Sequence, residues 1–334
     1  MKNKTILITG AAGYIGGTFA YEAVKRGYKV IGIDNFSNST KRNIQFIKNA
    51  FPNNFTFYEI DILSSELIKI FKKHSAIDCV FHFAALKSVP ESEKKPNHYF
   101  KNNVEGTQSL IKIMQSQNIK KLIFSSSAAV YGEHKIQPMD EKTDLNPKSI
   151  YAKTKKLSEE HIEKATEHNN LKAVSLRYFN PVGSHEEKCI GEDFQISENV
   201  MAKIVKVVLG LQNELYVYGN DYETEDGTGE RDYIHIDDIV EGHFKALHKI
   251  DSLEDYSVFN LGTGSATSVL KLIKTFEIIN NVEINYQITE RRQGDLARCF
   301  ANPFKANTEL NWHARYNLER MCKDTWEIIK NEPN

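Results

Sequence analysis

The chain has 334 residues and 43 lysines and arginines against 44 aspartates and glutamates, so its formal net charge is −1. This balance gives no general attraction to nucleic acid or to a membrane surface, and we expect neither as a partner. No apolar run approaches the roughly twenty residues of a membrane helix, and Met1–Lys4 leave no room for a signal peptide before the first predicted strand. These features predict a cytoplasmic protein of about two domains.

The first predicted strand, residues 5–9, leads through a glycine-rich turn into a predicted helix, residues 18–26. Gly10, Gly13 and Gly16 would allow a tight turn, a close approach of the backbone to a pyrophosphate, and close packing of the helix on the strand. The N-terminus of the helix would supply N–H groups to the anion. The pattern predicts a dinucleotide site.

A second predicted strand, residues 29–33, ends in Asp34. This position lies about twenty residues after the glycines, where a carboxylate can accept hydrogen bonds from the adenosine ribose hydroxyls. The same carboxylate would repel a 2′-phosphate. Asp34 therefore predicts NAD as the cofactor rather than NADP.

Strand and helix patterns continue to alternate through the first half of the chain. This alternation predicts an α/β fold with a doubly wound parallel Rossmann sheet, whose ligands lie beyond the carboxyl ends of the strands. The further predicted strands are residues 55–60, 79–83, 121–125 and 172–177, and the predicted helices are 66–74, 97–117 and 150–168. We expect residues 1–180 to form the NAD-binding domain.

The rhythm changes after Pro181, where a polar stretch is followed by a predicted helix at 199–209 and a polar loop at 219–229. We expect residues 181–334 to form a smaller mixed α/β lobe that binds the substrate. A helix and strand pattern at about 237–262 indicates that the chain rejoins the first sheet before it ends in the second lobe.

The cysteines and histidines show no metal-binding pattern. The spacing of the four cysteines indicates free thiols in a reducing compartment, and the eleven histidines contain no metalloprotease motif. We therefore expect no metal. The cysteines are Cys79, Cys189, Cys299 and Cys322.

A Tyr-x-x-x-Lys pattern occurs three times, so the pattern alone does not identify a catalytic tyrosine. The three pairs are Tyr21/Lys25, Tyr131/Lys135 and Tyr151/Lys155. Tyr21 falls well inside the first helix, and Tyr131 is followed at once by a glycine. Tyr151 opens a long predicted helix after a capping Ser149, which places Tyr151 and Lys155 on one face.

Ser127 lies upstream at the end of a predicted strand, on the cofactor side of the sheet. The Lys155 ammonium and a positive nicotinamide would stabilise the tyrosinate of Tyr151, lowering a pKa that is ordinarily about 10. Tyr151 could then act as a general base while Ser127 bonds the same substrate oxygen. The alternative interpretation is a surface tyrosine beside a solvated lysine.

With these residues in place, the chain resembles the extended short-chain dehydrogenase/reductase family, and within it the UDP-hexose 4-epimerases of the UDP-glucose/UDP-galactose type. The likeness runs nearly end to end. Its further motifs are Asp61-Ile62, Phe83-Ala84-Ala85-Leu86-Lys87, Asn102-Asn103-Val104, 176–183 (LRYFNPVG), 219–222 (GNDY), 225–229 (EDGTG), 231–235 (RDYIH) and 291–295 (RRQGD).

The resemblance implies two sets of binding residues. The cofactor set is Gly10, Gly13, Tyr14, Ile15, Gly16, Asp34, Asn35, Asp61, Ile62, Phe83, Ala84, Lys87, Asn102, Ser125, Tyr151, Lys155 and Phe179. The set for the UDP-hexose substrate is Ser127, Tyr151, Asn180, Asn199, Val200, Tyr216, Tyr218, Arg231, Arg292, Asp295 and Cys299. His235 also falls in a matched motif, and we interpret it as structural.

The implied reaction is a transient oxidation. Tyr151 takes the proton of the sugar 4-hydroxyl while a hydride passes to NAD, and the 4-keto sugar turns over and receives the hydride on its other face. Galactose-specific relatives carry a bulky tyrosine where this chain has Cys299, so we expect activity on UDP-GlcNAc and UDP-GalNAc as well. The predicted helices 97–117 and 150–168 resemble those that pair in family homodimers.

Three alternatives remain. A nucleotide-sugar 4,6-dehydratase would need an acid and a base after the strand-end hydroxyl, whereas Ala128 and Ala129 follow Ser127. A dehydrogenase of the same family would consume NAD. A catalytically silent NAD-sensing regulator would be expected to lack Tyr151 or Lys155, and both are present. Ala85 and Ala129 depart from residues common in the family, and we expect them to adjust the cavity lining only.

Overall fold

The structure is a computed structural model that describes residues 4–74, 76–134, 136–187, 189–292 and 295–330. The chain forms two compact units. Unit 1 comprises residues 1–132, 144–177 and 240–259, and unit 2 comprises residues 133–143, 178–239 and 260–334.

Residues 133–143 therefore belong to unit 2, although the expected NAD-binding domain of residues 1–180 included them. Backbone pairing far along the chain explains the difference. The Met139 N–H donates to the carbonyl oxygen of Phe300 at 3.0 Å, and Met139 accepts from the Asn260 side chain at 2.9 Å. No sequence pattern near residue 139 predicts that Met139 bonds Phe300 and Asn260.

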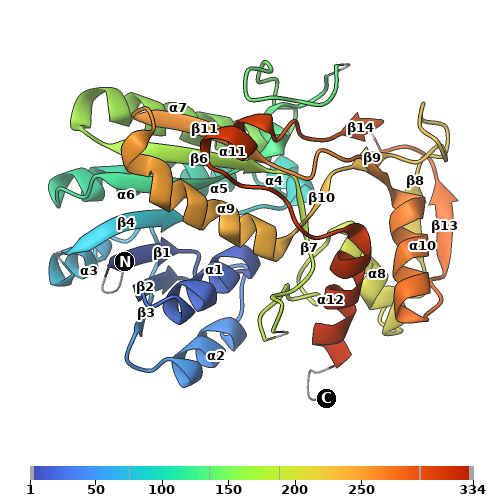
Figure 1. Cartoon of the computed structure of the whole chain (residues 1–334), viewed down its shortest axis with the longest axis horizontal. Coiled ribbons are helices and arrows are strands. Elements are labelled where there is room, and N and C mark those ends of the chain that lie inside the picture. The colour runs from blue at the N-terminus through green and yellow to red at the C-terminus, as the bar shows by residue number, and fades with distance from the viewer. Residues whose placement is uncertain (1–3, 75, 135, 188, 293–294, 331–334) are drawn as a thin grey trace. The chain divides into compact units, whose positions relative to one another are not determined.

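Unit 1 is built on a seven-stranded sheet with the order β11-β6-β5-β4-β1-β2-β3 (Figure 1). Strands β1 to β5 pair in parallel, which confirms the predicted doubly wound fold. The strands are β1 (Thr5–Thr9), β2 (Lys29–Asp34), β3 (Phe55–Glu59), β4 (Ile77–His82), β5 (Lys121–Ser127), β6 (Lys172–Tyr178) and β11 (Tyr256–Leu261).

Helices cover both faces of this sheet. They are α1 (Tyr14–Lys25), α2 (Arg42–Ala50), α3 (Leu67–Lys73), α4 (Val89–Lys94), α5 (Pro96–Tyr99), α6 (Gly106–Ser116), α7 (Ile150–Asn169) and α9 (Ile236–Lys249), with short turns at η2 (Ala128–Val130) and η3 (Ile250–Ser252). Apolar residues of α3, α6 and α7 join those of the strands in one buried cluster. On the other face, Phe19 of α1 packs on Phe244 of α9 with ring centroids 4.7 Å apart.

The single helix expected at residues 97–117 is interrupted. Its middle, η1 (Phe100–Glu105), is a π-helix between α5 and α6. A π-helical turn holds one more residue than an α-helical turn, and such turns are frequent at functional sites. The apolar pattern continues across it, so the sequence did not predict the interruption.

Unit 2 combines helices with short strands in three small sheets, β10-β7, β12-β9-β14 and β13-β8. The strands are β7 (Asn180–Val182), β8 (Leu215–Tyr218), β9 (Glu230–Arg231), β10 (Tyr233–His235), β12 (Thr267–Ser268), β13 (Tyr286–Thr289) and β14 (Arg298–Cys299). The helices are α8 (Val200–Val208), α10 (Val269–Asn280), α11 (Phe304–Glu309) and α12 (Leu318–Lys330). Its core packs α8, α10 and α12 together.

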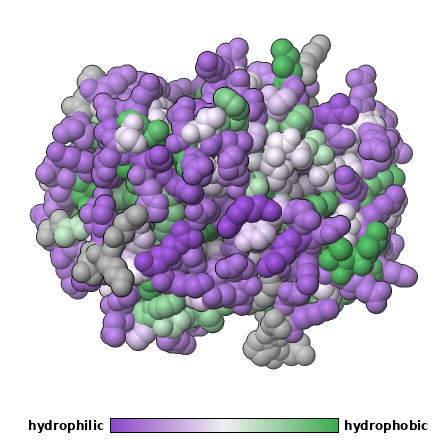
Figure 2. Space-filling model, viewed as in Figure 1, coloured by the Kyte–Doolittle hydropathy of each residue, from purple (hydrophilic) through white to green (hydrophobic). Residues whose placement is uncertain are grey.

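Hydrophilic residues cover most of the face shown in Figure 2, and hydrophobic residues form only small separate spots there. Among the described residues, no helix combines the length and the apolar character needed to cross a membrane.

Candidate active site

The turn between β1 and α1 has room only for glycine at two of its three predicted positions. Gly10 has a φ of +74°, and a Cβ there would lie 2.6 Å from the Ala84 nitrogen. A Cβ on Gly16 would lie 2.2 Å from the Gly10 carbonyl oxygen. Gly13 is the N-cap residue of α1, so no side chain bonds the N–H groups of the first helical turn there. The bare backbone and the helix N-terminus thus form a cradle that fits a pyrophosphate.

Asp34 ends β2, and its carboxylate organises the loop that follows. One carboxylate oxygen accepts from the Ala12 N–H at 3.0 Å. The other accepts from the Phe36 N–H at 2.8 Å and from the Ser39 hydroxyl at 2.9 Å. Asp34 therefore fixes the glycine turn and the loop together, a structural task that the sequence did not predict.

A cavity at this end of the sheet brings together six predicted cofactor residues, namely Gly10, Asp34, Asn35, Ile62, Ala84 and Asn102. Ser37 and Asn38 also line it, and sequence reasoning missed them. The Asn38 side chain donates to the Ala85 carbonyl oxygen at 3.0 Å. The run of small polar residues directly after β2 was the signal that could have identified them.

Asn102 and Asn103 both lie on the π-helix η1. Asn102 lines the cavity and donates to the Asn103 side chain at 2.9 Å. Asn103 is buried, bonds both the N–H and the carbonyl of Leu86, and donates to the Thr154 hydroxyl on α7. Asn103 thus connects the loop after β4 to the helix of the predicted base.

Tyr151 lies in the first turn of α7, which is capped by Ser149. The Tyr151 N–H donates to the Ser92 hydroxyl at 3.1 Å, so the start of the helix is tied to α4. Burial raises the pKa of the Tyr151 phenol, and a hydrogen bond with Ser127 opposes this shift. The pKa is therefore raised in the chain alone, and the lowered pKa expected beside Lys155 and a positive nicotinamide ring stays a prediction.

Lys155 lies one turn further along α7 and is buried. Its ammonium donates to the carbonyl oxygen of Ser125 at 2.6 Å and lies 4.7 Å from the centre of the Phe124 ring. Burial lowers the pKa of Lys155 to about 7, and the nearby Glu159 carboxylate opposes the shift. Ser125, Ser127, Tyr151 and Lys155 thus converge where β5 ends.

The other two tyrosines of the repeated pattern lie elsewhere. Tyr21 is buried on α1, where its ring packs against Phe46 and Phe51. Tyr131 is buried, and its hydroxyl accepts a hydrogen bond from Arg177 at 3.1 Å. Lys135, the partner of Tyr131 in the pattern, lies outside the described residues. Of the two lysine partners that the structure describes, Lys155 is buried and Lys25 is exposed.

The remaining predicted cofactor residues occupy several places. Asp61 follows β3 and accepts from the Asn35 side chain at 2.6 Å. Phe83 follows β4, Tyr14 and Ile15 begin α1, and Lys87 is exposed. Phe179 is buried and belongs to unit 2.

In unit 2, two predicted substrate arginines meet one carboxylate. Arg292 donates to Asp295 at 2.8 and 3.3 Å, and an Arg231 nitrogen lies 3.8 Å from the same side chain. The Arg292 guanidinium stacks over the Tyr218 ring at 4.5 Å. Cys299 is half-buried and pairs with Arg231 across two parallel strands. Gln293 and Gly294 of the matched motif lie outside the described residues.

The other predicted substrate residues of unit 2 lie at the start of α8 and on β7 and β8. Asn199 caps α8 by accepting from the Ala202 N–H, and it donates to both oxygens of Glu192. Val200 is the first residue of α8, and Asn180 is the first residue of β7. Tyr216 is exposed on β8, two residues from Tyr218. The amide of Asn199 is thus already engaged within the protein.

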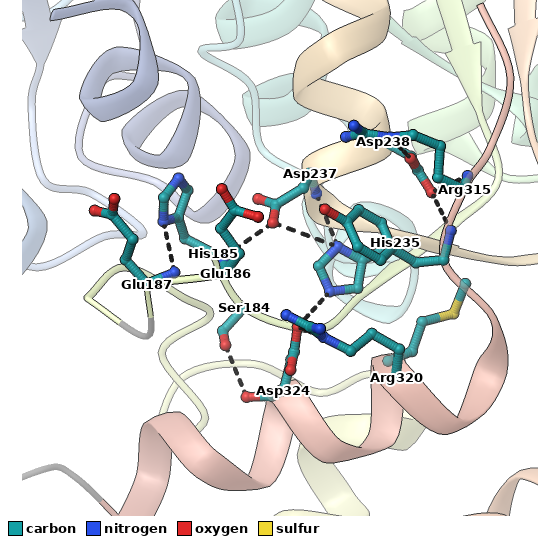
Figure 3. A network of polar contacts seen from close by, with 12 residues as sticks. Ser184, His185, Glu186, Glu187, His235, Asp237, Asp238, Arg315, Arg320 and Asp324 are labelled. Carbon is teal, nitrogen blue, oxygen red and sulfur yellow. Dashed lines mark hydrogen bonds and ion pairs between the residues drawn. The ribbon is translucent and has the colours of Figure 1, made fainter. Parts of the chain in front are cut away.

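His235 sits in a buried polar network of unit 2 (Figure 3). One ring nitrogen lies 3.2 Å from an Asp324 oxygen, and the other accepts from the Asp237 N–H at 3.1 Å. The Tyr316 ring packs on it at 4.4 Å. Figure 3 shows that Asp237 comes from α9 and Asp324 from α12, which fits the structural role expected of His235.

One group of described residues could hold a metal ion, because donor atoms of His185, Glu187 and Cys189 lie within 4.8 Å of one another. The His185 ring already accepts from the Glu187 N–H at 3.2 Å. The absence of a metal stays a prediction.

Comparison with known proteins gives consistent results. The family described as "NAD dependent epimerase/dehydratase family" matches residues 6–262. The chain is similar to the UDP-glucose 4-epimerase of Bacillus subtilis, with 42% identity over 96% of this chain and 95% of that protein. It is also 42% identical to the UDP-glucose 4-epimerase of Homo sapiens, over 99% of this chain and 98% of the human protein.

Two solved structures illustrate the likeness in fold. A UDP-glucose 4-epimerase from Stenotrophomonas maltophila, with bound NAD and formylated UDP-arabinopyranose, matches with a TM-score of 0.93 and 39% identity, covering 98% of each chain. The UDP-Glc/GlcNAc 4-epimerase of Campylobacter jejuni matches with a TM-score of 0.85 and 31% identity, covering 98% of this chain and 99% of that one.

Proposed function

The chain belongs to the NAD dependent epimerase/dehydratase family, and we propose that it interconverts UDP-glucose and UDP-galactose as an NAD-dependent 4-epimerase. The observation that carries the proposal is the convergence of Tyr151, Lys155 and Ser127 where β5 and α7 meet. In this proposal unit 1 binds NAD and unit 2 binds the UDP-sugar.

The chain's own residues divide the work. Tyr151 removes the proton of the sugar 4-hydroxyl and returns it at the end of the cycle, while Ser127 bonds the same oxygen. Lys155 stabilises the tyrosinate through its charge. Bound NAD would supply the redox chemistry, by accepting a hydride from the sugar C4 and returning it to the opposite face. Arg231 and Arg292 offer guanidinium groups that match phosphate oxygens of UDP.

The β1–α1 turn supports the cofactor assignment, because a Cβ at Gly10 or Gly16 would collide with the chain's own backbone and only glycine allows this tight turn before the helix N-terminus. Asp34, Asn35 and Asn102 would then lie along the adenosine side of NAD, in the cavity described above. The reaction is redox-neutral, so NAD is not consumed.

The decisive test incubates the purified protein with UDP-galactose and no added cofactor. We expect UDP-glucose to form until equilibrium is reached, without accumulation of NADH. A requirement for stoichiometric NAD, with NADH as a product, would instead identify a dehydrogenase. A product lighter by one water would identify a 4,6-dehydratase, which the alanines at positions 128 and 129 argue against.

The substrate range includes the N-acetylated sugars in our proposal. The Cys299 side chain is much smaller than a tyrosine, and it lies beside Arg231, a predicted phosphate ligand. A small side chain leaves space for an N-acetyl group on C2 of the sugar. The similarity to a UDP-Glc/GlcNAc 4-epimerase supports the same range.

We further propose a homodimer that works in the cytoplasm. Helices α6 and α7 lie side by side, as Figure 1 shows, and they could meet the same pair in a second copy. The four cysteines are free thiols, which suits a reducing compartment.

A further inference from the structure

Glu159 lies on the same face of α7 as the two predicted catalytic groups, four residues after Lys155 and eight after Tyr151. Successive residues at the end of β5 meet this face. The carbonyl oxygen of Ser125 accepts from the Lys155 ammonium, and the Ser126 hydroxyl donates to a Glu159 carboxylate oxygen. Two successive residues of β5 therefore hold the side chains of Lys155 and Glu159.

Glu159 forms a buried ion pair with Arg177 of β6. The two side chains are 4% and 5% exposed, and the guanidinium donates to the two carboxylate oxygens at 3.0 and 2.5 Å. A third nitrogen of Arg177 donates to the Tyr131 hydroxyl. Well-packed apolar residues often stabilise a core as well as such a pair does, so stability alone does not account for it.

The charges around Lys155 indicate how the Glu159–Arg177 pair can influence the proton transfer. Two titratable groups interact electrostatically with Lys155, namely Glu159 on its own helix and His82 on β4. His82 is buried, and burial followed by the Lys155 charge lowers its pKa to about 3, so it is neutral. Glu159 is therefore the anion that opposes the loss of the Lys155 proton.

We propose that Glu159 is a positioning residue for the reaction, because its carboxylate, held by Arg177 and Ser126, keeps Lys155 charged beside Tyr151. The inference rests on the proposed function, since it assigns a task within the same proton transfer. In this role Glu159 contacts neither the sugar nor the cofactor. It acts through the lysine alone.

The test is a double-mutant cycle of Glu159→Gln, Arg177→Met and the two combined. Without the Glu159 charge, Lys155 should lose its proton more readily, so the alkaline limb of the kcat profile should move down by roughly one pH unit or more. Without Arg177, Glu159 has Lys155 as its remaining cation, and the limb should move up. The double variant removes one charge of each sign and should return close to the wild type.

A second readout needs neither substrate nor turnover. Ultraviolet titration of tyrosinate, with the Tyr151→Phe change in each background subtracted, follows the ionisation of Tyr151 directly. Glu159→Gln should raise the pH at which Tyr151 ionises, because a less charged lysine stabilises tyrosinate less. Glu163→Gln is the matched control, since Glu163 lies one turn further along α7 and is exposed. It should leave both profiles unchanged.

The opposite signs separate the proposal from a structural role. Equal losses of kcat at every pH, or shifts of both single variants in one direction, would mean that the pair serves only stability and would overturn the proposal. If Glu159→Gln does not fold, the upward shift of Arg177→Met relative to the double variant still decides the matter. If the wild type shows no epimerisation, the proposed function fails, while the tyrosinate titration still tests Glu159.

Discussion

Cys299 of β14 lies in register with Arg231 of β9, so a half-buried thiol and a predicted phosphate-binding guanidinium are neighbours across two parallel strands. Burial raises the pKa of the Cys299 thiol to about 11, and the charge of Arg231 opposes the shift. At neutral pH Cys299 is thus a small uncharged side chain, and the proposed role in substrate range rests on its volume.

Replacing this thiol by an aromatic ring should narrow the substrate range. In Cys299→Tyr we expect kcat/KM for UDP-GalNAc to fall by roughly tenfold or more relative to that for UDP-galactose, because the ring would occupy the space of the N-acetyl group. Cys299→Ser, which keeps the size, should change the ratio little. A wild type without N-acetyl activity, or a tyrosine variant that retains it, would exclude steric control by residue 299.

Removing one oxygen from Tyr151 should stop the proton transfer and leave the fold intact. In Tyr151→Phe we expect turnover to fall by roughly 10²–10⁴-fold while the substrate still binds, as is typical of lost acid–base catalysis. Steady-state rates with UDP-galactose and calorimetric binding of UDP measure the two effects separately.

The two other tyrosines of the pattern serve as controls of different kinds. Tyr21→Phe should leave turnover unchanged, since the ring is packed among aromatic side chains of unit 1. Tyr131→Phe should lower stability, because Arg177 loses a buried hydrogen-bond partner. If Tyr21→Phe lost as much activity as Tyr151→Phe, the assignment of the base would be wrong.

Two glycines of the β1–α1 turn should respond differently to alanine. A Cβ on Gly16 would lie 2.2 Å from a backbone oxygen, so Gly16→Ala should destabilise the fold by about 1–3 kcal/mol. At Gly13 the nearest atom would be 3.4 Å away, so Gly13→Ala should fold normally and lose bound NAD through crowding of the pyrophosphate. Urea denaturation of the NAD-stripped variants and their NAD content after purification check the two effects. Normal NAD content in Gly13→Ala would place the pyrophosphate elsewhere.

Acid should destabilise the protein through His82, which bonds the hydroxyls of Thr9 and Thr107 in the core. Burial lowers its folded pKa to about 3, whereas the unfolded value is about 6.5. Between these values the unfolded state binds more protons, so the free energy of unfolding falls as the pH falls, by up to about 1.4 kcal/mol per pH unit.

The variant His82→Gln should show a shallower slope between pH 6.5 and pH 4, although it is less stable at pH 8. Urea denaturation across this range measures the slope. The exposed His313 provides the control, since His313→Gln should keep the slope of the wild type. Identical slopes in the His82 variant and the wild type would show that His82 is charged in the folded state.

Assembly through α6 and α7 predicts a definite mass. Light scattering at micromolar concentration should report about twice the mass of one chain. A monomer at that concentration would contradict the proposed homodimer. A charge placed on an exposed position of α6, such as Ser116→Glu, should weaken the dimer by repulsion across the symmetric contact if α6 forms part of it.

The sequence predicted those parts of the site whose residues lie close together along the chain. The glycine turn and Asp34 are local, because a strand, a turn and a helix that follow one another carry their own spacing. The helical spacing of Tyr151 and Lys155 is local too. By contrast, the pairing of Glu159 with Arg177 joins a helix to a later strand, and no spacing rule connects them.

The same distinction explains the assignment of residues 133–143 and the π-helix. Residues 133–143 belong to unit 2 because Met139 bonds residues far along the chain. The π-helix η1 is a change of backbone hydrogen bonding within an unbroken apolar pattern. Asn199, a substrate residue by resemblance, also caps α8 and bonds Glu192, and these contacts were not predicted from the sequence.

The engagement of Asp34 bears on attempts to engineer the cofactor preference. A single substitution intended to admit a 2′-phosphate would remove the acceptor for the Ala12 N–H, the Phe36 N–H and the Ser39 hydroxyl at once. The carboxylate that would repel a 2′-phosphate is therefore the same group that holds the loop after β2 in place. A redesign for NADP therefore has to replace residues 34–39 together and supply new hydrogen-bond acceptors for the Ala12 and Phe36 N–H groups. A cationic residue for the 2′-phosphate can be added only after that.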